Sequence, residues 1–111
     1  MKILAAIVTH NRCELLERCI NHLQKQTRLP DSILVVNNGS TDATVDMLMR
    51  RNIQYITQEN LGSAGGWNRC ISHALEHHFD AVWLMDDDGF PSPSALERLE
   101  SNLDTGTACV S

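Results

Sequence analysis

The sequence lacks the features that define several large classes of protein. No apolar run approaches the roughly 20 residues that a helix needs to cross a bilayer. The net charge is −5, whereas a general nucleic-acid binder would carry a basic patch. No two of the four cysteines form a C-x-x-C pair, which argues against a zinc knuckle. Their scattered positions are typical of reduced, packed thiols in a cytosolic protein: Cys13, Cys19, Cys70 and Cys109.

Length and composition fit one globular domain. The chain has 111 residues, of which 42% are hydrophobic and 21% are charged, without internal repeats or low-complexity linkers. Apolar runs alternate with stretches of helical spacing, and this alternation predicts an α/β fold with a mostly parallel sheet flanked by helices. The predicted strands are residues 2–8, 33–36, 53–57, 81–85 and a stretch from about 107. The predicted helices are residues 13–26, a stretch from 40, residues 66–78 and a stretch from 92.

The two ends of the sequence allow a prediction of whether the chain is a whole domain. The first apolar run is short and lacks a small-residue cleavage site, so it favours a strand over a signal peptide. No closing helix follows the last predicted strand. We therefore expect a truncated domain, cut from something longer, with one sheet edge exposed.

Three local patterns give further expectations. Asn11 and Glu14 have the spacing of a capping box at the start of the first helix. The glycine-rich residues 58–66 predict a loop that packs closely against a ligand or a neighbouring strand. His73 and His77 lie one helical turn apart, but no acid or cysteine completes a zinc site nearby, so we expect a solvated helix face.

The most informative stretch is the apolar run 81–85, which ends abruptly in Asp86, Asp87 and Asp88. Three adjacent carboxylates at the tip of a buried strand repel one another. A divalent cation offsets this charge because it binds oxygen ligands. Open α/β sheets also bind their ligands at the carboxyl ends of strands. The triplet therefore predicts a metal-assisted site for an anion such as a phosphate, with a solvated acidic turn or a helix-capping cluster as the alternative.

Two other polar loops are expected at the same edge of the sheet. Residues 9–12 are Thr-His-Asn-Arg, and residues 37–42 are Asn-Asn-Gly-Ser-Thr-Asp. In the right-handed arrangement, the strands before these loops and the strand before the acidic triplet are neighbours. Amide and hydroxyl groups suit a base or a ribose, and carboxylates suit a metal-bound diphosphate. A turn followed by a helix N-cap is the alternative for residues 37–42.

As an ordered set, these segments resemble the N-terminal half of an inverting family 2 glycosyltransferase with the GT-A fold. The matching segments are residues 7–12, 35–42, 60–68 and 83–88, with Pro93 beyond them. The Asn-Gly-Ser-Thr-Asp, Gly-Ser-Ala-Gly-Gly and Asp-Asp-Asp variants are similar to those of rhamnosyl- and galactofuranosyl-transferase-like members. The resemblance implies a Rossmann-like GT-A fold in which residues 1–111 form the nucleotide-sugar-binding part.

The resemblance also implies roles for individual positions. Asp86 and Asp88 would bind the Mg²⁺ or Mn²⁺ that bridges the diphosphate, as in a DXD motif. Asp86 or Asp87 would hold ribose, sugar or a metal-bound water. Asn38 matches a position that is often Asp and contacts the base, and its neutral amide leaves the base open. The expected nucleotide-sugar-binding residues are Thr9, Asn11, Arg12, Asn37, Asn38, Gly65, Asp86 and Asp87.

The activity implied by the resemblance is inverting transfer from a UDP- or dTDP-linked sugar to a glycan, lipid-linked or protein-linked acceptor, in cell-wall or polysaccharide biosynthesis. The family's catalytic base is an acid beyond the metal motif, and Asp104, in a short turn, is a poor equivalent. We therefore expect this chain to bind donor without completing transfer, in the cytoplasm or peripherally at the inner face of the membrane. The alternatives are a non-catalytic nucleotide-binding module and a metal-dependent nucleotidyl- or phosphotransferase.

Overall fold

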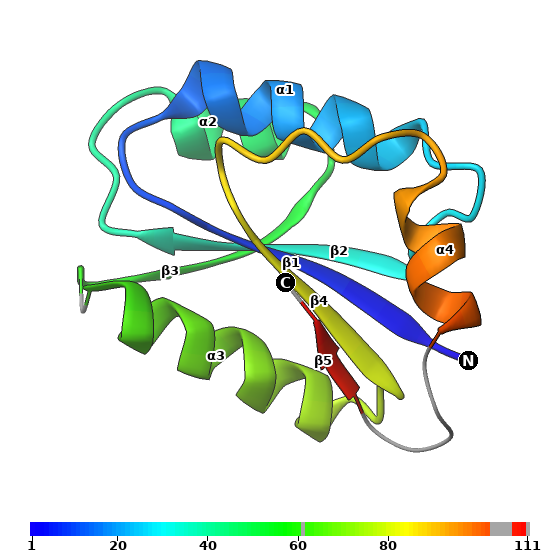
Figure 1. Ribbon diagram of the computed structural model, residues 1–111. Helices are drawn as coiled ribbons and strands as arrows, with labels where there is room; N and C mark the ends of the chain where they lie inside the picture. Colours follow the sequence, from blue (N-terminus) through cyan, green and yellow to red (C-terminus); the bar gives the residue numbers. More distant parts are fainter. Residues whose placement is uncertain (61, 103–107, 111) are drawn as a thin grey trace.

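The computed structural model describes residues 1–60, 62–102 and 108–110 (Figure 1). One sheet of parallel strands runs in the order β3-β2-β1-β4-β5. The strands are β1 (Ile3–Thr9), β2 (Ser32–Asn38), β3 (Gln54–Gln58), β4 (Ala81–Asp86) and β5 (Ala108–Val110). The helices are α1 (Cys13–Gln24), α2 (Thr44–Arg50), α3 (Gly62–Glu76) and α4 (Ala95–Ser101). The predicted α/β class is confirmed.

The central strand β1 is buried on both faces because helices cover both sides of the sheet. Its side chains alternate, so that Ile3 and Ile7 join one apolar cluster while Leu4 and Ala6 join the other. A strand buried in this way needs a continuous apolar run rather than an alternating one. The sequence of β1 therefore follows from its place in the middle of a parallel sheet.

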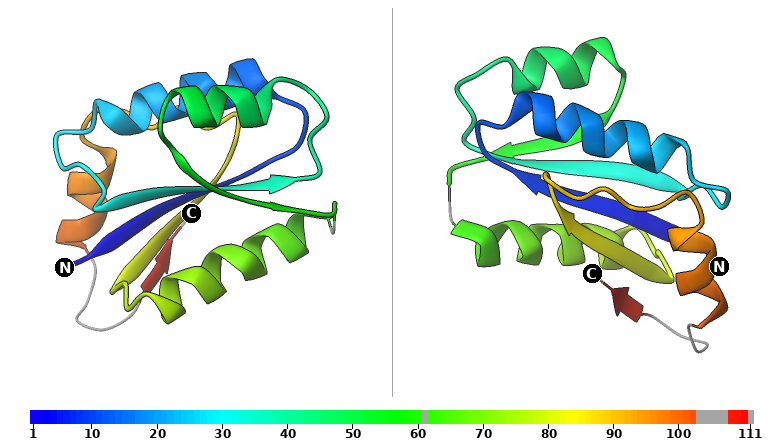
Figure 2. Two further views of the ribbon diagram at one scale, coloured as in Figure 1. Left: turned by 180° about the vertical axis from the view of Figure 1, so that it is seen from behind. Right: turned by 45° about the horizontal axis from the view of Figure 1, so that its top comes forward.

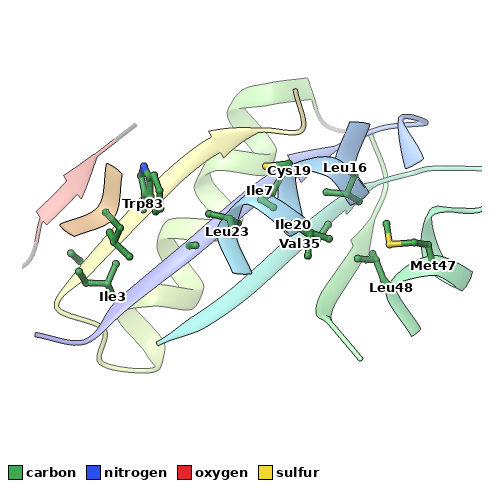
Figure 3. Close-up of a cluster of buried hydrophobic side chains, with 13 residues drawn as sticks. Ile3, Ile7, Leu16, Cys19, Ile20, Leu23, Val35, Met47, Leu48 and Trp83 are labelled. Carbon is green, nitrogen blue, oxygen red and sulfur yellow. The ribbon is translucent and has the colours of Figure 1, made fainter. Parts of the chain in front are cut away.

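Helices α1 and α2 cover one face of the sheet and α3 covers the other (Figures 1 and 2). Figure 3 shows the cluster beneath α1, where Leu16, Ile20 and Leu23 are fully buried together with Ile7 and Val35 of the sheet. Each such side chain contributes about 1.5–3 kcal/mol on removal from water. The spacing of these residues at one helical face explains why this stretch folds as an amphipathic helix. In the described part of the chain, no helix has the length and apolar character that a membrane crossing requires.

The glycine-rich segment differs from the prediction of a loop over residues 58–66. Helix α3 already begins at Gly62, so the predicted loop is wrong for residues 62–66. The close packing expected of this segment is present: a Cβ added at Gly66 would lie only 2.5 Å from Cγ1 of Val8 on β1. The glycine allows the helix to approach the sheet, and this packing outweighs the low helix propensity of the residue.

Other helix starts also differ from the predictions. The predicted capping box is wrong, because the cap residue of α1 is Arg12, whose own side chain makes no capping hydrogen bond. Asn11 instead adopts a φ of 52°, and its Oδ1 accepts a hydrogen bond from the backbone N–H of Thr41 at 2.7 Å. Helices α2 and α4 begin later than predicted, at Thr44 and Ala95. Tertiary contacts between loops decide these boundaries.

The histidines at the end of α3 and just after it are not all solvated. His73 is only 6% exposed and stacks on His77, with the ring centroids 4.1 Å apart. Burial lowers the pKa of His73, and the nearby His77 and Arg69 lower it further. The prediction of a solvated face therefore fails for His73, because this position faces the aromatic ring of Phe79 beside the sheet.

Candidate functional site

The candidate site lies where the sheet order changes direction. From β1 the chain builds β2 and β3 to one side and β4 to the other. The ends of the three central strands are in register, since Thr9 pairs with Asn37 of β2 and Val8 pairs with Asp86 of β4. The predicted adjacency of the three polar loops is therefore confirmed. Open α/β sheets bind ligands in the crevice at such a switch point.

A cavity of about 370 Å³ occupies this switch point, a size typical of small-molecule sites. Five of the predicted site residues line it: Thr9, Arg12, Asn38, Asp86 and Asp87. Residues that were not predicted also line it, namely Val8, His10, Asn60 and Gly62. His10, Asn60 and Gly62 lie within the recognised motifs, so their position beside predicted residues was the signal available in the sequence.

Asn11, Asn37, Gly65 and Asp88 do not line this cavity. Asn37 is fully buried, and its Oδ1 accepts a hydrogen bond from the backbone N–H of Ser40 at 3.1 Å. Gly65 lies in the first turn of α3, beside the cavity-lining Gly62. A direct role in binding stays a prediction for each of these four residues.

The loops after β1 and β2 are joined by hydrogen bonds between their polar groups. The backbone N–H of Asn11 donates to Oγ of Ser40 at 3.0 Å. The Asp42 carboxylate accepts hydrogen bonds from the backbone N–H of Cys13 at 3.2 Å and from that of Thr44 at 3.0 Å. Asp42 thus satisfies donors at the starts of both α1 and α2. The hydrogen bonds from Thr44 lower the pKa of the exposed Asp42, and a smaller desolvation effect opposes them.

The side chain of Asn38 is already engaged by the protein. It is only 3% exposed, and its Nδ2 donates to the carbonyl oxygen of Gly62 at 3.0 Å. Its Oδ1 accepts a hydrogen bond from Nε2 of Gln58 at 2.9 Å. A carboxylate at this position could not donate to Gly62, so the amide explains how the end of β2 holds the start of α3.

His10 adds a second polar link at the rim of the cavity. Its Nδ1 lies 2.7 Å from the carbonyl oxygen of Asn38. A carbonyl oxygen only accepts, so Nδ1 carries a proton, and Nε2 lies 3.4 Å from Nδ2 of Asn11. The ring is consequently held in one orientation against the cavity.

The three acids of the triplet have different surroundings. Asp87 is 4% exposed, whereas Asp86 and Asp88 are exposed. Burial raises the pKa of Asp87, while a hydrogen bond from Thr9 and the charge of Arg12 oppose that shift. The segment after the triplet lies along α1 (Figure 1), where the guanidinium carbon of Arg18 is 3.6 Å from the centroid of the Phe90 ring. This stacking holds the segment that follows the acids against α1.

A cation would not find a complete cage of protein ligands here. Within residues 1–60, 62–102 and 108–110, no group of three or more His, Cys, Asp or Glu side chains is arranged to hold a metal ion. Mg²⁺, however, is commonly held by one or two carboxylates together with substrate phosphates and waters. The exposed Asp86 at the cavity and Asp88 two residues later supply oxygen donors of that kind. The donor set therefore fits a cation that arrives with a phosphate ligand.

The protein is an open α/β sheet with a polar cavity at its switch point. The chain belongs to glycosyl transferase family 2, whose model matches residues 5–111. It is similar to galactofuranosyltransferase GlfT1 of Mycobacterium tuberculosis (strain H37Rv), with 41% identity over 92 residues that cover 78% of this chain and 30% of that protein. GlfT1 of Mycolicibacterium smegmatis is 34% identical over 97 residues, which cover 85% of this chain and 32% of that protein.

Solved structures share the fold. The crystal structure of S. aureus TarS matches with a TM-score of 0.73 at 23% identity, covering 91% of this chain and 19% of that one. A crystal structure of TarS 1–349 in complex with UDP matches with a TM-score of 0.67 at 22% identity, covering 91% of this chain and 31% of that one. The chain thus spans about a third of the length of the curated GlfT1 relatives that it matches.

Proposed function

We propose that the cavity binds the nucleoside diphosphate part of a sugar donor, UDP- or dTDP-linked, and that residues 1–111 are the donor-binding part of an inverting glycosyltransferase. The observation that carries the proposal is the convergence of Thr9, Arg12, Asn38 and Asp86 from three neighbouring strand ends on one cavity. Membership of glycosyl transferase family 2 supports it, and so does the fold shared with a TarS structure that contains UDP.

The charges around the cavity suggest where each part of the donor lies. The Arg12 guanidinium would face the diphosphate, because planar guanidinium groups bind phosphate oxygens well. Asp86 and Asp88 would hold Mg²⁺ or Mn²⁺, which when bound would offset the charge of the leaving diphosphate. Asn38 ends β2, on the side of the cavity away from β4, and would face the nucleoside together with Thr9 of the central strand.

The acceptor side of the reaction is proposed to depend on other parts of the protein. None of the acids described beyond Asp88 lines the cavity, and Asp104 lies outside the described residues. We place the general base that activates the acceptor hydroxyl outside the residues described here. The acceptor is proposed to be a glycan or a lipid-linked glycan at the cytoplasmic side of a membrane.

Calorimetric titration of the intact protein with UDP, dTDP and GDP tests this function. We expect UDP or dTDP to bind, and 1 mM Mn²⁺ to strengthen that binding by about tenfold or more relative to EDTA. Asp88→Asn should remove most of the strengthening by Mn²⁺. Asp46→Asn, which makes the same change at an exposed position on α2, should retain it.

Two results would contradict the proposal in different ways. Failure of the intact protein to bind any nucleoside diphosphate would reject donor binding at this cavity. Binding that is equally strong in Mn²⁺ and EDTA, or an Asp88→Asn variant that still responds fully to Mn²⁺, would reject the metal role alone.

A further inference from the structure

Asp87 is the one acid of the triplet that turns away from solvent. It is 4% exposed, whereas Asp86 before it and Asp88 after it are both exposed. A buried carboxylate is costly unless other groups compensate its charge. Its partners therefore indicate what this position is used for.

Both carboxylate oxygens of Asp87 are directed to the end of β1 and the loop that follows it. Oγ1 of Thr9 donates to Oδ2 at 2.9 Å in a buried hydrogen bond. Nη1 of Arg12 donates to Oδ1 at 3.4 Å. The carboxylate thus links two residues of one loop to the end of β4, across separations of 78 and 75 residues in the sequence.

Arg12 is the only lysine or arginine among the described residues that line the cavity. Its side chain remains 55% exposed, and Asp87 is its only ion-pair partner in the described part of the chain. The side chain of Arg12 is therefore still accessible to a ligand in the cavity. Without a fixed partner, a long arginine side chain loses rotamer freedom when it binds, and that loss weakens affinity.

We propose that Asp87 is a positioning residue that holds the Arg12 guanidinium toward the diphosphate of the donor. It acts through Arg12 and Thr9 and does not bind the cation. The acidic triplet is then divided between two tasks: Asp86 and Asp88 face the cation, and Asp87 orders the loop after β1. This inference rests on the proposed function, since it needs a diphosphate in the cavity.

Asp87→Asn gives an effect whose sign is diagnostic. The amide retains an oxygen that can accept the Thr9 hydroxyl, but it loses the charge that holds Arg12. If Asp87 merely added negative charge to the cavity, its removal would strengthen the binding of an anion. If it positions Arg12, its removal should weaken UDP or dTDP binding by about tenfold.

The titrations are made with the intact protein in EDTA, so that a lost metal ligand cannot produce the effect. The binding of the nucleoside alone should change less than twofold, because it has no diphosphate for Arg12 to bind. In an Arg12→Ala background, Asp87→Asn should cause no further loss. Glu59→Gln removes one negative charge beside the cavity-lining Asn60, and it should leave affinity unchanged or slightly raise it.

Unchanged or stronger diphosphate binding by Asp87→Asn in EDTA would overturn the proposal, and so would an equal loss in the Arg12→Ala background. A wild-type protein that binds no nucleoside diphosphate would instead reject the proposed function. A second pair of variants, Thr9→Val and Thr9→Ser, tests the link to β1 without a change of charge. The melting temperature should fall for Thr9→Val and be largely restored for Thr9→Ser, and equal melting temperatures would overturn the link.

Discussion

Two arginines at opposite ends of the strands make different sets of contacts. Arg28, near the amino ends of the strands, donates to both carboxylate oxygens of Glu100, at 3.1 and 3.0 Å, and to Asp31 at 3.1 Å. It also donates to the carbonyl oxygens of Met1 and Leu29. At the carboxyl ends of the strands, Arg12 makes one ion-pair contact of 3.4 Å and remains 55% exposed.

The difference separates a structural group from a binding group. The donors of Arg28 join the chain start, the segment before β2 and helix α4, and its side chain is only 22% exposed. The hydrogen bond from Arg28 lowers the pKa of Glu100, which is the shift expected of a carboxylate held in its charged form. Arg12 lies in a polar cavity with donors still unused, which is where an anionic ligand would be bound.

Arg28→Ala should have the largest effect on folding. It leaves Glu100 and Asp31 without their shared partner, and we expect the free energy of unfolding to fall by about 2 kcal/mol in chemical denaturation. The difference from wild type should shrink as the pH falls from about 4 through the lowered folded pKa values of the two carboxyls. Arg12→Ala is the comparison and should lose less, about 1 kcal/mol, because it removes a single contact of 3.4 Å but leaves the buried Asp87 without its charge partner. Similar losses for the two variants would remove the distinction between the arginines.

Asp42→Ala should have an intermediate effect and tests whether the loops around Arg12 are themselves well ordered. The variant loses the acceptor for backbone N–H groups at the starts of α1 and α2, which should cost about 1 kcal/mol of unfolding free energy. Asp42→Asn keeps one acceptor oxygen and should lose less. A neutral outcome for Asp42→Ala, measured by denaturant titration, would indicate that water replaces these hydrogen bonds.

His73 should have the smallest effect on the free energy of unfolding, and this effect should depend on pH. Its pKa is lower in the folded protein than the value of about 6.5 in an unfolded chain, so the unfolded chain binds protons first as the pH falls. The contribution of His73 to stability is then fully present above about pH 6.5 and is lost as the pH falls toward the lower folded pKa.

Denaturation measured at several pH values between 8 and 5 checks this expectation. His73→Gln should flatten the decline, whatever its effect on stability at pH 8. His78→Asn, at an exposed position whose φ of 59° Asn tolerates, should leave the decline unchanged. A decline of the same size in His73→Gln would assign the effect to another group.

The strands and the site edge could be predicted from the sequence because their signals are local. The apolar run of β1 and the abrupt change from Met85 to Asp86 both mark a strand and its end. Once parallel strands with helical connections are accepted, chain topology brings the ends of β1, β2 and β4 together. Five predicted site residues line the cavity for that reason.

The predictions failed where the outcome depends on contacts between distant residues. The start of α3 at Gly62 depends on close approach to Val8, which glycine propensity does not reveal. Asn11 has the spacing of a capping residue, but it binds the loop after β2 instead. The sequence shows that both segments are polar or glycine-rich. It does not show which distant residues they contact.

The sequence by itself determined the fold class, the strand ends that carry polar groups and the family that this pattern resembles, because periodicity and residue type are local properties. Only the tertiary structure decided which of Asp86, Asp87 and Asp88 is buried, and which arginine is fully bonded. Three identical side chains in a row carry the same local signal. Their surroundings differ because the parallel sheet brings distant residues close to only one of them. Asp87 receives a hydrogen bond from Thr9, which is 78 positions away in the sequence.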